Sequence, residues 1–136
     1  PGEDKNDFKE TVKLIDEVKF INSFSFIFSP RPGTVAADLP LIDKKIAKER
    51  LEIVQQILFN NQINMNKKFE GKIINVLVEN RTDDESKLFA RSEYMTSVIF
   101  SGSNDLIGKV VKVKIKNSNR NNLFGEVMEQ SNKKVA

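Results

Sequence analysis

Residues 111–116 alternate strictly between apolar and basic side chains, and this period of two limits the fold more than any other feature. In an extended chain, successive side chains point to opposite sides. One side would then carry three apolar residues and the other three lysines: Val111, Val113 and Ile115 against Lys112, Lys114 and Lys116. A helical conformation would scatter both sets around its axis. The segment is therefore predicted to be a β-strand with one buried face.

Four further segments with strand character surround this one. They are rich in β-branched and aromatic residues, are separated by polar turns such as 82–86, and cover residues 71–79, 87–91, 97–100 and 123–128. Five short strands within about sixty residues are typical of a small closed barrel of the oligonucleotide-binding type. We expect an antiparallel five-stranded barrel over residues 68–130, followed by a tail at 131–136.

The first part of the chain has a different pattern. Asp4 is placed to cap a helix, with Asp7 three residues later where a capping box has its acid. Apolar residues at helical spacing continue this helix to about Lys19. In Ser23–Phe28, phenylalanines alternate with smaller residues, which predicts a buried strand. A turn rich in proline and glycine follows at 29–34.

A long helix is predicted over residues 41–67, with Asp43 able to cap it and no glycine or proline inside it. One helix and one strand cannot bury both faces of a sheet. We therefore interpret 1–40 as the end of a larger α/β domain and 41–67 as a connecting helix, which makes the chain α+β overall. The alternative is an independent α+β domain whose strand joins the later sheet.

Composition excludes several kinds of chemistry. The chain has no cysteine, so its residues cannot form disulfides, thiolate zinc sites or iron–sulfur ligation. It has no histidine, so a Ser-His-Asp triad cannot form. No apolar run approaches the roughly 18–20 residues of a membrane span, and no signal peptide opens the chain. We expect a cytoplasmic protein without a membrane partner.

Positive charge is concentrated in the second half of the chain. Residues 1–67 are balanced, with ten basic and ten acidic side chains, whereas residues 68–136 carry twelve and nine. Lysines on the same face of a strand lie roughly 6.6–7 Å apart, close to the phosphate repeat of a nucleic acid. The lysines of 110–116 would therefore track an RNA backbone. The alternative is a solvated strand edge that lysine keeps from pairing with other chains.

Several motifs resemble a known family. Residues 1–3, 7–8 and 23–38, the last with a Phe-Ile-Phe-Ser-Pro-Arg-Pro-Gly-Thr run, resemble the end of the radical-SAM core of the tRNA methylthiotransferases. The strand region resembles the TRAM domain that ends these enzymes. Its points of similarity are Val76–Glu79, Arg91–Glu93, Phe100, Asp105–Lys109 and Leu123–Gly125.

This resemblance implies an activity and its cofactors. Members add a methylthio group to C2 of the prenylated adenosine next to the tRNA anticodon, using S-adenosylmethionine and two 4Fe-4S clusters. The cluster cysteines lie outside this chain, so we expect it to be inactive alone and to bind neither cofactor. Gly2, Glu3, Ser29 and Arg31 would edge the S-adenosylmethionine site. Two residues have simpler alternatives: Arg31 orders its own loop, or Glu3 is a solvated acid at a helix start.

The resemblance also implies partners: the tRNA anticodon arm and the N-terminal part of the same enzyme. The sequence departs from the family at Asn80, where glycine is usual, and at Tyr94 and Met95, where two asparagines are common. Tyr94 could stack on a base instead. The RNA-binding candidates are Lys72, Arg81, Arg91, Tyr94, Lys112, Lys114, Lys116 and Arg120. Two other hypotheses stay open, a stand-alone RNA-binding adaptor and a protein-interaction barrel, and only RNA binding would weaken steeply with salt.

Overall fold

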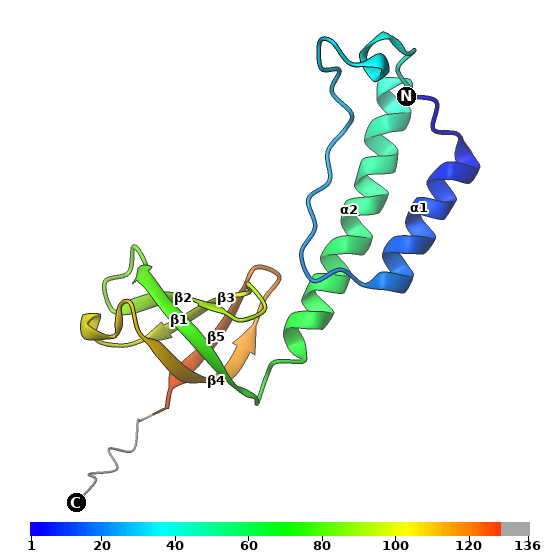
Figure 1. The fold of residues 1–136 in the computed structure, drawn as a ribbon. Coiled ribbons are helices and arrows are strands. Elements are labelled where there is room, and N and C mark those ends of the chain that lie inside the picture. The colour runs from blue at the N-terminus through cyan, green and yellow to red at the C-terminus, as the bar shows by residue number, and fades with distance from the viewer. Residues whose placement is uncertain (129–136) are drawn as a thin grey trace, which may run out of the picture. The chain divides into compact units, whose positions relative to one another are not determined.

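The computed structural model describes residues 1–128 (Figure 1). The chain divides into two compact units, Pro1–Gln62 and Ile63–Ala136, and each is described by itself. The predicted tail at 131–136, and the last two residues of the predicted barrel domain, lie outside the described residues. The predicted domain boundaries after residues 40 and 67 stay predictions.

The first unit begins with the capped helix α1, Lys5–Val18. Asp4 accepts hydrogen bonds from the backbone N–H groups of Asn6 and Asp7 at 2.7 and 2.9 Å. The Asp7 carboxylate accepts one from the Asp4 N–H at 2.9 Å, so the predicted capping box is confirmed. The helix ends where Lys19 adopts a left-handed conformation with φ of 54°.

The second helix, α2, spans Lys44–Lys67 after a short 3-10 turn, η1, at Val35–Asp38. Asp43 caps it as predicted, accepting from the N–H groups of Lys45 and Ile46 at 2.9 and 3.3 Å. The Asn61 amide donates to the Ile15 carbonyl at 3.4 Å, and Arg50 donates to Glu3. The Glu3 contact lies near the start of both helices and the Ile15 contact near the end of both, so α1 and α2 run parallel. The chain between them returns along their length (Figure 1).

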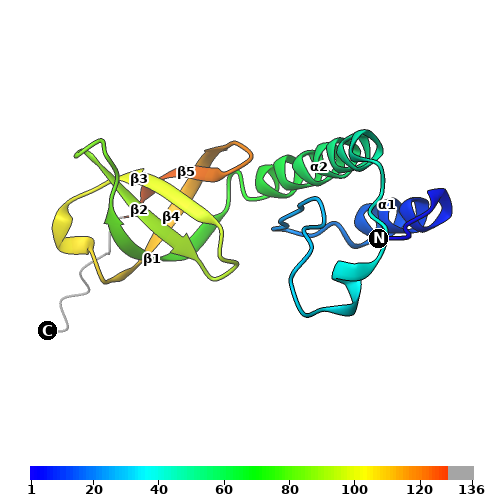
Figure 2. The same ribbon diagram turned by 90° about the horizontal axis from the view of Figure 1, so that it is seen from above.

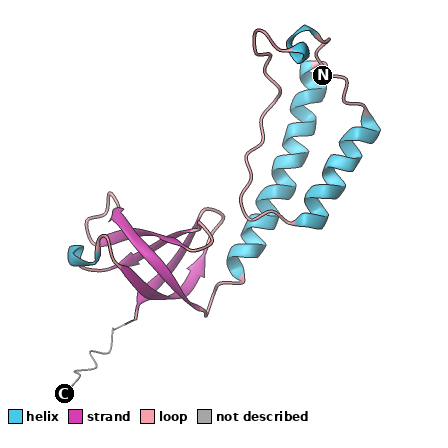
Figure 3. Cartoon of the chain, in the orientation of Figure 1, coloured by secondary structure: helices cyan, strands magenta, loops and turns pink. Residues whose placement is uncertain are grey.

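The predicted strand at Ser23–Phe28 is not formed. This segment is extended but belongs to no sheet, and it is drawn as a loop in Figure 3. A strand needs a neighbour to receive its backbone hydrogen bonds. Residues 1–128 provide no such neighbour: all strands among them belong to the closed barrel of the second unit. The alternative in which this segment joins the later sheet is therefore wrong.

The second unit is a closed five-stranded barrel (Figure 2). All five predicted strands are confirmed, with ends that differ from the prediction by a few residues. They are β1 Ile73–Arg81, β2 Lys87–Ser92, β3 Ser97–Ser101, β4 Val110–Ser118 and β5 Asn122–Val127, with a 3-10 turn, η2, at Asn104–Leu106. Around the barrel the order is β1, β2, β3, β5, β4, with β4 closing onto β1.

The expectation that every strand pair is antiparallel is wrong for one pair. Strands β3 and β5 are parallel, with Val98 beside Leu123, whereas the other four pairs are antiparallel. The reason is geometric. Directions that alternate around a closed ring require an even number of strands, so a ring of five must contain a parallel pair.

The barrel encloses a continuous apolar core. The inward positions of all five strands supply it: Ile74, Val76, Val78, Leu88, Ala90, Val98, Phe100, Val111, Val113, Ile115 and Leu123. Irregularities in register occur between Val78 and Asn80 and between Ile115 and Asn117. Each inserts one extra residue, and such bulges bend a strand around a small barrel. The core therefore fixes which side chains face outward, where a ligand can reach them.

Candidate nucleic-acid interface

Strand β4 carries the predicted lysines on the outside of the barrel. Its inward residues are buried, whereas Lys112 and Lys116 are exposed and Lys114 is half-buried. On the neighbouring strand β1, Asn75 lies beside Lys112 and Ile73 beside Lys114. No acid is opposite either lysine on β1, but on the other side of β4 Lys114 lies beside Glu126 of β5. Of these two lysines, Lys112 alone has no acid among its strand partners in residues 1–128.

Lys116 differs from the other two lysines. It occupies the bulge of β4, where it is the unpaired residue between Ile115 and Asn117. Its ammonium group lies 3.5 Å from the Glu126 carboxylate on β5. The even spacing of three lysines that the sequence predicts is therefore interrupted at the third. Since its charge is partly offset, Lys116 offers less to a phosphate than Lys112 does.

Arg91 on β2 is held by an acid on the adjacent strand. Its guanidinium donates two hydrogen bonds to the Glu79 carboxylate, at 3.0 and 3.4 Å. The same group lies 5.3 Å from the Phe89 ring centroid. This forked pair uses the planar geometry that would otherwise recognise a phosphate. An RNA phosphate would have to compete with Glu79 for Arg91.

The two arginines near turns also have local partners. Arg81, at the end of β1, donates to the Asn104 amide oxygen in η2. Arg120, in the β4–β5 turn, donates to the Asn121 side chain at 3.2 Å, and its carbonyl accepts from Asn66 at 3.0 Å. Structure and sequence thus agree that both residues lie at turns, where they help to shape the loops.

Acidic side chains at the β1–β2 turn and in η2 would repel a polyanion nearby. Asp84 accepts hydrogen bonds from the Ser86 hydroxyl and N–H at 2.6 and 3.1 Å, and these bonds lower the pKa of the Asp84 carboxyl. The Ser103 hydroxyl likewise lowers the pKa of Asp105. Both carboxyls are therefore ionised at neutral pH. Arg81 directly precedes the acidic turn, so it is a poorer phosphate contact than the β4 lysines.

An aromatic pair that the sequence did not predict lies on the barrel unit. The rings of Phe69 and Tyr94 are 5.6 Å apart between centroids and tilted by 49°. The Lys72 ammonium lies 6.0 Å from the Phe69 centroid. Lys72 and Tyr94 were predicted as separate RNA contacts, and the structure brings them together around Phe69. No sequence spacing could indicate this, because Phe69 and Tyr94 are distant along the chain.

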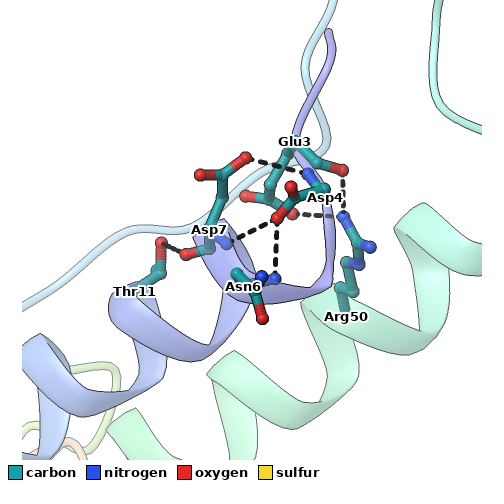
Figure 4. A network of polar contacts seen from close by, with 6 residues as sticks. All are labelled: Glu3, Asp4, Asn6, Asp7, Thr11 and Arg50. Carbon is teal, nitrogen blue, oxygen red and sulfur yellow. Dashed lines mark hydrogen bonds and ion pairs between the residues drawn. The ribbon is translucent and has the colours of Figure 1, made fainter.

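In the first unit, Gly2 and Glu3 were predicted to lie at the edge of the S-adenosylmethionine site. Glu3 is held by Arg50, a residue that the sequence did not indicate. The Arg50 guanidinium donates to both the backbone carbonyl and the carboxylate of Glu3, each at 2.7 Å (Figure 4). Its carbon centre lies 5.4 Å from the Phe8 ring centroid. Gly2 has a φ of 77°, which favours glycine. Glu3 is therefore an ion-paired, partly buried acid and not a freely solvated one.

Ser29 and Arg31 lie in the exposed proline-rich turn. The Arg31 carbonyl accepts hydrogen bonds from the Thr34 N–H at 3.3 Å and from its hydroxyl at 2.8 Å. The backbone of Arg31 thus takes part in ordering the loop. A groove of 790 Å³ is lined by α1, α2 and residues 24–28, and includes Glu3 and Arg50, but neither Ser29 nor Arg31 lines it. The structure does not bring the four predicted cofactor residues into one pocket.

A metal-binding cluster and a membrane-spanning helix each have requirements that the described part of the chain does not meet. No group of three or more His, Cys, Asp or Glu side chains is arranged to hold a metal ion in residues 1–128. None of the helices within that range is both long and apolar enough to cross a membrane.

Comparison with known proteins agrees with this arrangement. Residues 67–128 match the model of the TRAM domain. The tRNA-2-methylthio-N(6)-dimethylallyladenosine synthase of Pelagibacter ubique (strain HTCC1062) is 64% identical over all 136 residues. The chain is thus similar along its whole length to part of a tRNA methylthiotransferase. It spans about 30% of the length of that relative.

Two further relatives with the same name show how far the similarity extends. The synthase of Vesicomyosocius okutanii is 44% identical over 131 residues, which is 96% of this chain and 30% of the relative. The synthase of Yersinia pestis (strain Pestoides F) is 42% identical over 127 residues, 92% of this chain and 27% of the relative. The similarity therefore includes both units, and the resemblance to the methylthiotransferases and to their TRAM domain is confirmed.

Proposed function

We propose that this chain is the C-terminal part of a tRNA methylthiotransferase that modifies C2 of the prenylated adenosine next to the anticodon. The barrel binds the anticodon arm of the tRNA, and residues 1–40 form the edge of the S-adenosylmethionine site. The observation that carries this proposal is similarity over both units to synthases of that name, at up to 64% identity. Such a tRNA substrate would place the enzyme in the cytoplasm.

The geometry of the first unit supports a place at the edge of an α/β domain. Parallel helices joined by an extended return segment are the arrangement found where strands and helices alternate around a parallel sheet. Here the return segment exposes Phe24 and Phe26 by 88% and 82%. These rings are expected to pack against the N-terminal part of the enzyme, with Ser23–Phe28 added to its sheet. A stand-alone adaptor would leave them in water.

The residues of this chain fit one cofactor and not the other. Iron–sulfur clusters need thiolate ligands, and the chain has no cysteine, so the clusters belong to the rest of the enzyme. S-adenosylmethionine carries an ammonium group and ribose hydroxyls, and a carboxylate such as Glu3 can accept hydrogen bonds that these groups donate. When bound, it supplies the radical and methyl chemistry. Arg50 fixes the orientation of Glu3 through its two hydrogen bonds.

The barrel proposal is tested by the salt dependence of tRNA binding to the chain. A triple variant, Lys112→Gln, Lys114→Gln and Lys116→Gln, should weaken binding and flatten the plot of log affinity against log salt. Each lost phosphate contact removes roughly 0.7–0.9 from the slope. Because Lys116 is paired with Glu126, the expected loss is about 1.4–1.8, the amount for two lysines instead of three.

The matched control changes the same number of charges elsewhere. Lys5→Gln, Lys9→Gln and Lys13→Gln remove three exposed lysines from α1. This variant should keep the slope of the unchanged chain if binding is confined to the barrel. An equal loss in both triple variants, or an unchanged slope in the barrel variant, would contradict the proposed interface.

The enzymatic proposal is tested in a chimera. The matching C-terminal segment of the Pelagibacter ubique synthase is replaced by this chain, and methylthio transfer to prenylated tRNA is measured anaerobically. We expect activity to be retained, and an Arg50→Gln substitution to raise the KM for S-adenosylmethionine more than it lowers kcat. A folded chimera with its clusters intact but no activity would argue against the proposed role of this chain.

A further inference from the structure

The strongest feature not used so far is the cluster of Phe69, Tyr94 and Lys72 on the barrel unit. Tyr94 is 48% exposed, Phe69 is half-buried, and Lys72 is exposed beside them. The Phe69 ring packs against the barrel core, lies beside the tilted Tyr94 ring and has the Lys72 ammonium 6.0 Å from its centroid. The cluster therefore exposes aromatic ring surface, chiefly that of Tyr94, next to a positive charge.

We propose that Phe69 and Tyr94 form a stacking site for one unpaired base of the bound RNA, with Lys72 on an adjoining phosphate. This inference rests on the proposed function, since it takes RNA as the ligand of the barrel. It adds the form of RNA that is recognised. Only a base outside a duplex exposes its face to a side chain, so the site selects a single-stranded or looped segment.

The turn that carries Tyr94 is held in place before any ligand binds. The Ser92 hydroxyl oxygen accepts from the N–H groups of Tyr94 and Thr96, each at 3.2 Å. Ser92 and Thr96 also bond through their backbones at 3.0 Å, and the Met95 N–H donates to the Ser92 carbonyl at 2.9 Å. A side chain on a fixed turn loses little conformational entropy on binding, so Tyr94 is preorganised as a stacking surface.

Phe69 and Lys72 are placed by the turn that leads from α2 into β1. The Phe69 N–H donates to the Asn66 carbonyl at 3.0 Å, and the Lys72 N–H donates to the Phe69 carbonyl at 2.9 Å. Asn66 itself is buried and donates to the carbonyls of Asn119 and Arg120 at 2.8 and 3.0 Å. Both rings are therefore fixed to the barrel, Phe69 through Asn66 and Tyr94 through Ser92.

Tyr94 provides its own probe, because it is the single tyrosine of a chain without tryptophan. Tyrosine fluorescence of the 136-residue chain is followed during titration with a short single-stranded RNA. The comparison ligands are the same RNA with its complement annealed and the same RNA with abasic sites in place of its bases. Stacking predicts quenching by the first ligand, little quenching by the duplex, and binding without quenching by the abasic strand.

Substitutions separate stacking from general attraction. Tyr94→Leu should lower the affinity for the single strand by roughly tenfold, in line with the loss of one stacked base. Phe69→Leu should lower it less, and Tyr94→Phe should restore it, because the ring and not the hydroxyl is needed. Phe26→Leu, an exposed aromatic of the first unit, is the matched control and should leave the affinity unchanged.

The outcomes distinguish this inference from the function on which it rests. If the chain binds no RNA, both the proposed function and the stacking site are overturned. If it binds with the expected salt slope but the single strand does not quench Tyr94, and Tyr94→Leu binds as tightly as the unchanged chain, then the stacking site alone is overturned. Equal quenching by duplex and single strand also overturns it.

Discussion

The two units of this chain are similar in size but differ in how completely they bury their own apolar side chains. In the first unit, the buried hydrophobic residues among those described are Ile15 and Leu58, while Phe24 and Phe26 lie mostly in solvent. In the barrel, inward residues of all five strands form one core. A closed sheet supplies both a core and partners for its backbone, whereas two helices and an extended segment supply neither completely. The barrel therefore encloses a core of its own, whereas the first unit leaves large apolar side chains uncovered.

The largest expected difference comes from the same substitution made in both units. Phe100→Ala removes a ring from the barrel core and should lower the free energy of unfolding by about 3–5 kcal/mol. Phe26→Ala, at a mostly exposed ring, should change it by less than about 0.5 kcal/mol. Urea unfolding followed by Tyr94 fluorescence, which reports on the barrel, and by circular dichroism measures both. A large loss from Phe26→Ala would mean that the first unit is more complete than its exposure indicates.

A second prediction concerns the tight packing between β4 and β5. A Cβ added at Gly125 would collide with the Lys114 carbonyl and lie 2.7 Å from a Val113 methyl group. Gly125→Ala should therefore destabilise the barrel by about 1–3 kcal/mol. Gly102→Ala is the matched control, because its Cβ would meet only side-chain atoms, the nearest at 3.0 Å. Side chains can move aside and a paired strand cannot, so comparable losses in thermal unfolding would contradict this reasoning.

A third prediction compares two amide side chains of α2. Asn66 is 1% exposed and donates to two carbonyls of the β4–β5 turn. Asn66→Ala would remove both of these buried hydrogen bonds and should cost about 1–3 kcal/mol. Gln62 makes one exposed bond, to Asn22 at 3.2 Å, and Gln62→Ala should cost less than about 0.5 kcal/mol. Equal effects in denaturant unfolding would show that burial does not set the value of these bonds.

The smallest expected effect is a pH dependence of the first unit. Hydrogen bonds from the N–H groups of Asp7 and Asn6 lower the pKa of Asp4 in the folded state. Asp4 therefore contributes stability above its unfolded pKa, and this contribution is lost as the pH falls through the lower folded pKa. Asp4→Asn keeps a capping acceptor but does not titrate. Its helix content, measured by circular dichroism, should fall less than that of the unchanged chain between pH 5 and pH 2.

Much of the barrel was predictable from sequence because its strands and turns depend on residues only a few positions apart. The alternation of Val111, Val113 and Ile115 with lysines predicted which face of β4 is buried. Turn residues marked the ends of the strands. Both helix caps were also predictable, since Asp4 and Asp43 bond to N–H groups two or three residues away. The parallel pair of β3 and β5 was missed, although it follows from closing an odd number of strands.

The candidate sites were less predictable because they depend on residues distant in sequence. Lys72 and Tyr94 were identified singly, but their arrangement around Phe69 arises only when the barrel closes. The pairing of Arg91 with Glu79 depends on the register of β1 and β2, which includes a bulge. Arg50 gave no signal in the sequence because its partner Glu3 lies at the other end of the first unit.

By itself, the sequence determined the local elements, the excess of positive charge in the second half and the absence of thiolate and imidazole ligands. These depend on residue type and on spacing within a few positions. Only the tertiary structure decided which charges are offset, which rings meet and whether Ser23–Phe28 becomes a strand. Those outcomes depend on neighbours that the chain brings together by folding, and an extended segment without a neighbour has nowhere to direct its backbone hydrogen bonds.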